Sequence, residues 1–69
     1  MKLSYKKLWV KLVERDLKKT KFAKEAGISS ASLAKLGKGA NITTDVLVKI
    51  CEYFNCDISE IVEIVSDDE

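Results

Sequence analysis

Apolar residues recur along the chain at intervals of three and four, which is the spacing of one face of an α-helix. No stretch of four or more residues alternates cleanly between apolar and polar positions, so the pattern predicts helices and no strands. We expect five helices in a single all-α domain that spans residues 1–69. Because the chain has no proline, glycines and capping residues mark where the helices end.

The second and third predicted helices are short and are separated by a tight turn. The second covers about residues 19–25, and the third covers about residues 30–36 after a serine that can cap it. Gly27 can adopt the positive φ that a turn between two steeply crossed helices requires. Gly37 and Gly39 are predicted to stop the third helix.

The outer face of this third helix has an unusual composition. Leu33 and Leu36 lie on one side of a helical wheel, and Lys35 lies on the opposite side among alanines and serines. That face carries no carboxylate. A helix that fits a DNA groove needs small side chains near the groove wall and a few donors that reach bases and phosphates. The pattern therefore favours a helix-turn-helix unit that places its second helix in the major groove.

Two more helices are expected in the C-terminal half, one after Thr43 and one after Asp57. The apolar face of the last helix has two interpretations. Ile58 and Ile61 can seal the core, whereas an exposed part of that face would form a symmetric dimer contact. Residues 66–69 are expected to form an acidic, frayed tail. The candidates for the dimer contact are Ile61, Ile64 and Val65.

Charge is divided unevenly along the chain, although the formal net charge is only +1. Residues 1–39 hold eleven lysines and arginines against three carboxylates, whereas residues 40–69 hold one lysine against eight carboxylates. A basic half attracts DNA phosphates by releasing counterions, and an acidic half discourages binding in the reverse orientation. The alternative is that these are ordinary solvated surface charges.

Several function classes are disfavoured by the composition. The chain has no histidine to act as a general base and no glycine-rich phosphate loop, so an enzyme is not expected. Cys51 and Cys56 cannot close a zinc site alone, and we expect two small buried side chains in a reducing compartment, with no metal or cofactor. No apolar run approaches a membrane span and no signal peptide is evident, which predicts a cytoplasmic protein without a membrane partner or an evident small-molecule ligand.

Three blocks of the sequence resemble those of a known family. They read SYKKLW at residues 4–9, GISSASLAKLGKG at residues 27–39 and VLVKICEYFNCDISEIVEIV at residues 46–65. Together they are similar to a short branch of the XRE-type helix-turn-helix transcriptional regulators, which are related to the phage repressors and Cro. The resemblance covers nearly the whole chain. It implies a compact five-helix, repressor-like domain whose second and third helices bind double-stranded DNA, commonly as a homodimer on a palindromic operator.

The resemblance also implies which residues contact DNA. Its base-reading positions fall on Ser30, Ala31 and Lys35. Its phosphate-contacting positions fall on Lys19 and Lys38, with Asn41, Thr43, Lys18 and Ser32 as further candidates. Lys35 is the one long side chain on the reading face that can discriminate bases, most simply at guanine O6 and N7. Base specificity is therefore expected to rely partly on DNA shape or on a second subunit.

A protein-binding module is the alternative function. An antitoxin-like protein or a phage accessory factor of the same fold would use the third helix, or the apolar surface of residues 61–65, to bind another protein. Lys19 and Lys38 would then serve only as solubilising charges. A stoichiometric protein partner, with no DNA selected from a random pool, would favour this alternative.

Overall fold

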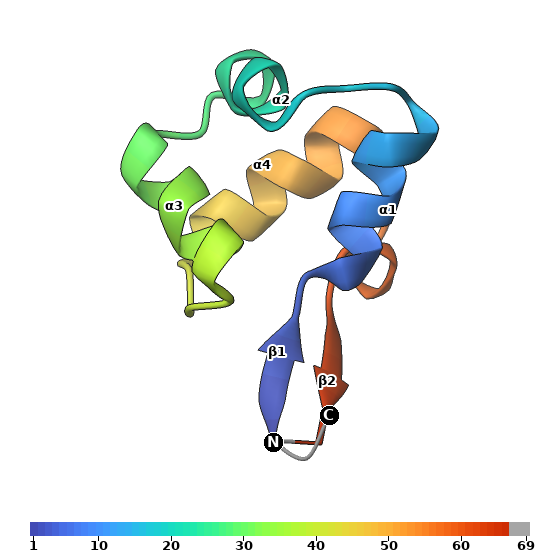
Figure 1. Cartoon of the computed structure of the whole chain (residues 1–69), viewed down its shortest axis with the longest axis vertical. Coiled ribbons are helices and arrows are strands. Elements are labelled where there is room, and N and C mark those ends of the chain that lie inside the picture. The colour runs from blue at the N-terminus through green and yellow to red at the C-terminus, as the bar shows by residue number, and fades with distance from the viewer. Residues whose placement is uncertain (67–69) are drawn as a thin grey trace.

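The computed structural model describes residues 1–66, which form four α-helices, one 3₁₀-helix and two short strands. In chain order these are β1 (Lys2–Ser4), α1 (Lys6–Glu14), α2 (Lys19–Ala26), α3 (Ser30–Lys38), α4 (Thr44–Phe54), η1 (Ile58–Glu60) and β2 (Glu63–Val65). Helix α4 crosses the middle of the molecule, with α1 on one side and α2 and α3 on the other, and the two strands project from the helices (Figure 1). None of the helices in residues 1–66 has the length and apolar character needed to span a membrane.

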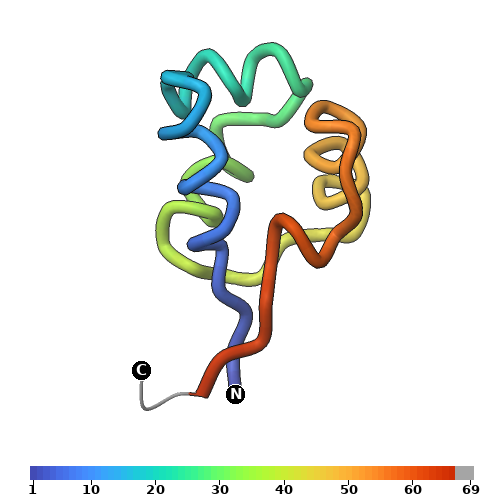
Figure 2. Tube along the Cα trace, turned by 90° about the vertical axis from the view of Figure 1, so that its right-hand side faces the viewer, coloured from blue at the N-terminus to red at the C-terminus, as the bar shows by residue number. Residues whose placement is uncertain are grey.

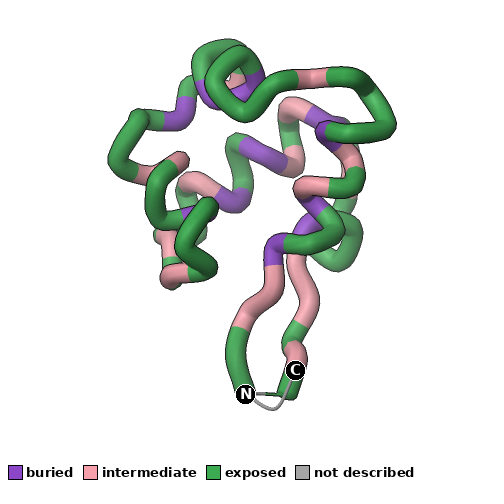
Figure 3. Tube along the Cα trace, viewed as in Figure 1, coloured by how far each residue is buried: buried purple, intermediate pink, exposed green. Residues whose placement is uncertain are grey.

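The core draws at least one side chain from each of the four α-helices. Its largest fully buried side chains are Leu8 of α1, Phe22 of α2, Leu36 of α3, Ile50 of α4 and Ile61. The rings of Phe22 and Phe54 are stacked with their centroids 5.6 Å apart, which joins α2 to α4. Every α-helix has buried positions, and much of α3 is exposed (Figure 3). The apolar stripes therefore converge on one core, as the helical periodicity predicts.

The turn between α2 and α3 follows the predicted local signals. Gly27 ends α2 with a φ of 77°, and the Ser29 side chain caps α3 by accepting the N–H of Ser32 at 3.1 Å. The predicted stop at Gly37 is wrong. Gly37 lies inside α3 without a positive φ, and the helix continues to Lys38 before Gly39 ends it with a φ of 73°. A glycine ends a helix where it supplies the left-handed conformation, and here only Gly39 does so.

The expectation of an all-α, five-helix domain is wrong for the C-terminal segment, which does not form a fifth α-helix. After Asp57, whose carboxylate accepts the N–H of Ile58 at 2.7 Å, the chain forms only the three-residue η1. Strand β2 then pairs antiparallel with β1, with Lys2 opposite Val65. The two ends of the described chain thus run side by side (Figure 2). Four of the five residues 61–65 are β-branched, which favours an extended backbone over a fifth α-helix.

Because this segment is not a helix, the residues predicted to form the dimer contact differ in their exposure. Ile61 is fully buried and seals the core, so it is removed from the proposed dimer contact. Ile64 is 60% exposed on β2, and Val65 is half-buried. Ile58, expected to help seal the core, is instead 44% exposed. Apart from Ser66, the predicted acidic tail lies outside the described residues.

Candidate nucleic-acid interface

The outward face of α3 carries the residues predicted to read bases. Ser30, Ala31 and Lys35 are all exposed. On the opposite side, Leu36 is buried and Leu33 is half-buried against the core. The two leucines fix α3 to the body of the protein, so the small and basic side chains of its other face are available to a ligand.

Ser32 has a partly internal role. It is half-buried, and its hydroxyl oxygen accepts a hydrogen bond from the Ser29 hydroxyl at 3.1 Å. A serine hydroxyl has one proton to donate as well as oxygen lone pairs to accept. Ser32 can therefore keep its contact with Ser29 and still donate to a phosphate oxygen.

The N-terminus of α2 is open and basic. Lys18 occupies the N-cap position in an extended conformation, and no side chain caps the helix. The first N–H groups of an uncapped helix are available to an anion and carry the positive end of the helix dipole. The Nζ atom of Lys19 lies 4.3 Å from the centroid of the Trp9 ring, a cation–π distance that orients this side chain against α1. Lys18 and Lys19 thus lie at a helix end that favours a phosphate.

The loop between α3 and α4 presents the remaining predicted phosphate contacts. Asn41 and Thr43 are exposed in this loop, and Lys38 is exposed at the C-terminal end of α3. Thr43 caps α4 by accepting the N–H of Val46 at 3.4 Å, which leaves its hydroxyl proton for another acceptor. The buried Tyr5 hydroxyl donates to the carbonyl of Ala40 at 2.7 Å and ties the loop to the end of β1. Burial raises the pKa of Tyr5, which keeps the phenol protonated and able to donate.

Helix α4 contributes two further contacts that position the helix-turn-helix, and the sequence pattern alone did not single them out. The Nζ atom of Lys49 donates to the carbonyl of Gly27 at 3.3 Å. The Tyr53 hydroxyl donates to Glu25 Oε1 at 2.5 Å, and this hydrogen bond is the main cause of a raised Tyr53 pKa. A tyrosine near an apolar stripe commonly places its hydroxyl on a polar partner, which is the signal that could have identified Tyr53.

Two lysines of α1 and the lysines of α3 differ in their contacts. On α1, the Nζ atom of Lys7 lies 4.0 Å from a Glu63 oxygen and 3.1 Å from the Ser59 carbonyl oxygen, and Lys11 lies 3.5 Å from Glu60. Within residues 1–66, neither Lys35 nor Lys38 forms an ion pair. Lys7 and Lys11 therefore hold the C-terminal segment, while the lysines of α3 remain available to an external anion.

The candidate chemistry of the thiols is limited. Cys51 and Cys56 are free and half-buried, less buried than the sequence suggested. Burial is the main cause of a raised pKa at Cys51, so its thiol is held in the protonated, less reactive form. No group of three or more candidate metal ligands occurs in the described part of the chain.

Comparisons with known proteins agree with this arrangement. The family model of the Cro/C1-type HTH DNA-binding domain matches residues 7–67. Among solved structures, the crystal structure of the transcriptional regulator VanUg, form II, is 44% identical in sequence and superposes with a TM-score of 0.90. That match covers 96% of this chain and 88% of the VanUg chain. No curated protein matches the sequence.

Proposed function

Because the chain belongs to the Cro/C1-type helix-turn-helix DNA-binding family, we propose that it is a transcriptional regulator that inserts α3 into the major groove of double-stranded DNA. The observation that carries this proposal is the exposed face of α3, which is small, hydroxylic and basic. The VanUg structure, described as that of a transcriptional regulator, supports the same function at 44% identity.

Three side chains of α3 read bases in this proposal. Lys35 donates to guanine O6 and N7, because it is the long donor on the exposed face of the helix. Ala31 is small enough to let α3 approach and can contact a thymine methyl group. Ser30 accepts from or donates to several bases, so it adds affinity with little discrimination.

Phosphate contacts surround this reading face and set its register on the duplex. The uncapped start of α2, with Lys18 and Lys19, holds one phosphate group. Residues of α3 and of the loop that follows it contact other phosphate groups. The residues proposed there are Ser32, Lys38, Asn41 and Thr43.

We also propose that the protein acts as a homodimer. One chain presents one reading helix, which covers one half-site, and a palindromic operator needs two. Ile64 is 60% exposed on one face of β2, whereas the half-buried Val65 lies on the opposite face and lines the groove between β1 and α3, so Ile64 is the centre of the proposed contact at the end of the two-stranded sheet. A symmetric contact through this sheet would give the dimer two copies of α3, one for each half-site.

Binding of labelled duplexes, followed by anisotropy at several salt concentrations, tests the proposed roles. Lys35→Ala should weaken the free energy of binding to a preferred site by about 1–3 kcal/mol and reduce the sequence preference at one base pair. Lys19→Ala should weaken binding to all sequences and lower the slope of log affinity against log salt by about 1. Lys7→Ala is the matched control, because it removes the same charge from a lysine that faces Glu63.

Two results would contradict these roles. Absence of duplex binding by the wild-type protein at low salt would refute DNA binding itself. Equal losses for Lys35→Ala and Lys7→Ala on every sequence would refute base reading by Lys35.

A protein-binding module remains the second candidate because the acidic half also exposes apolar side chains. Val48 of α4 is 55% exposed, and Ile58 is 44% exposed nearby on a groove that both residues line. A stoichiometric protein complex that survives size-exclusion chromatography, from a protein that retains no duplex at low salt, would favour this function.

A further inference from the structure

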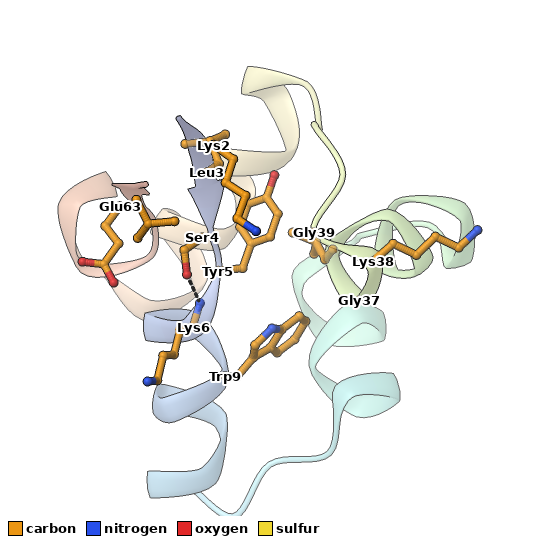
Figure 4. A pocket seen from close by; sticks show the side chains of 12 residues that line it. Lys2, Leu3, Ser4, Tyr5, Lys6, Trp9, Gly37, Lys38, Gly39 and Glu63 are labelled. Atoms are coloured by element: carbon orange, nitrogen blue, oxygen red, sulfur yellow. Dashed lines mark hydrogen bonds between the residues drawn. The ribbon is translucent and has the colours of Figure 1, made fainter. Parts of the chain in front are cut away.

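A groove of about 640 Å³ opens between β1 and the C-terminal end of α3. Tyr5 and Trp9 place their rings between its two walls (Figure 4). Lys2 projects into it from the β1 wall, and the α3 wall is formed by Gly37, Lys38 and Gly39. The groove therefore joins the N-terminal strand to the helix that carries the proposed base-reading residues.

The groove is electropositive. Lys2 reaches into the groove from the β1 wall, whereas Lys38 lies on the α3 wall with its ammonium group directed outward from α3 (Figure 4), and within residues 1–66 neither of them forms an ion pair. Glu63 also lines the groove, but its carboxylate lies on the far side of β1 in Figure 4 and faces Lys7 at 4.0 Å. Lys19, placed over the Trp9 ring, extends the line of cations towards the start of α2. An array of cations of this kind attracts phosphates.

The α3 wall of the groove also contains a glycine, Gly37, that the fold itself does not explain. A glycine inside a helix is less stable than alanine, because it has more conformational freedom to lose on folding. Gly37 is helical without a positive φ, and a Cβ atom built there meets no heavy atom within 4 Å. Nothing in the described chain therefore requires a glycine at this position. Close approach of an external backbone would require one.

We propose that this groove holds a stretch of DNA phosphodiester backbone next to the half-site read by α3, with Lys2 contacting a phosphate from the β1 wall and Lys38 contacting a neighbouring phosphate on the outer side of α3. The proposal rests on the proposed function and adds a contact from the N-terminal strand. A polyanionic chain fits better than a single free anion, because the cations are spread along an open groove and do not converge on one point.

Lys2→Ala in the full chain tests this contact, with Lys7→Ala as the matched loss of charge. At 0.1 M salt, Lys2→Ala should lower duplex affinity by roughly fivefold to tenfold and reduce the salt slope by about 0.9, the effect of one neutralised phosphate. Lys2→Arg should retain most of the affinity. Trp9, the only tryptophan, lines the groove, and its fluorescence should change when duplex DNA occupies it.

The outcomes separate this proposal from the proposed function. If the wild-type protein binds duplex DNA but Lys2→Ala matches Lys7→Ala in affinity and salt slope, the groove is not a phosphate site and the proposed function stands. A Trp9 signal that stays constant while anisotropy reports binding would likewise refute the groove site alone. If the wild-type protein does not bind duplex DNA, both proposals are refuted.

Discussion

The three glycines of the chain perform different tasks. Gly27 and Gly39 follow α2 and α3 with φ values of 77° and 73°, a left-handed conformation that other residues adopt only at a cost. Gly37 lies inside α3 and has no such requirement. A local rule was enough to identify Gly27 as the end of α2. With two glycines two positions apart, the same rule could not tell which one would take the positive φ.

Alanine substitution should therefore have opposite effects at Gly37 and Gly39. Gly37→Ala should raise the free energy of unfolding by about 0.5–1 kcal/mol, because alanine loses less conformational freedom in a helix. Gly39→Ala should lower it by about 1–2 kcal/mol, because a Cβ atom strains the left-handed conformation. Urea unfolding followed by circular dichroism measures both changes.

Gly37→Ala should also weaken duplex binding if the groove beside α3 holds DNA. A variant that is more stable and yet binds less tightly cannot be explained by a loss of folded protein. A destabilised Gly37→Ala variant would show that the glycine has a structural role within the chain. Unchanged duplex affinity would show that no backbone approaches it closely.

At the scale of elements, helices α2, α3 and α4 could be predicted because their signals are local. Ser29 and Thr43 cap α3 and α4 through contacts three residues along the chain, and the apolar stripes repeat within each helix. The C-terminal strand could not be predicted in this way. Its apolar residues repeat at helical intervals, its three residues are too few to show alternation, and its partner β1 lies at the other end of the chain.

In the candidate interface, too, local patterns predict which residues are exposed but not which distant segments lie beside them. The exposure of Ser30, Ala31 and Lys35 followed from the helical wheel of α3. The groove beside Lys2 did not, because it depends on where the β1–β2 pair lies relative to α3. The roles of these residues towards DNA stay predictions until binding is measured.

The strand β2 gives the proposed dimer a specific test at Ile64. Ile64→Lys should raise the dimer dissociation constant on the order of tenfold or more, because a symmetric contact places the two new charges near each other. Its stability as a monomer should change little, since the side chain is 60% exposed. Val48→Lys is the control, because Val48 is a similarly exposed apolar residue on α4. Sedimentation equilibrium that finds the wild type monomeric, or both variants equally dimeric, would rule out this contact.

At the scale of the whole molecule, the acidic and basic halves of the sequence have different partners. The acidic C-terminal segment pairs with α1, where Glu60 and Glu63 face Lys11 and Lys7. The basic side chains of α2 and α3 are left for an external partner. The net charge of +1 therefore understates how basic the candidate interface is. Raising the ionic strength should strongly weaken the binding of an anionic partner, because salt screens exposed cations most.

Selection of duplexes from a random pool, carried out with the wild-type protein and with Lys35→Ala, tests most directly whether α3 reads DNA. We expect the wild type to enrich a site with a preferred guanine, and Lys35→Ala to lose the preference at that position. A dimer should enrich two half-sites whose centres are about 10 base pairs apart. Failure of the wild type to retain any duplex at low salt, or identical enrichment by both proteins, would contradict reading of DNA by Lys35 on α3.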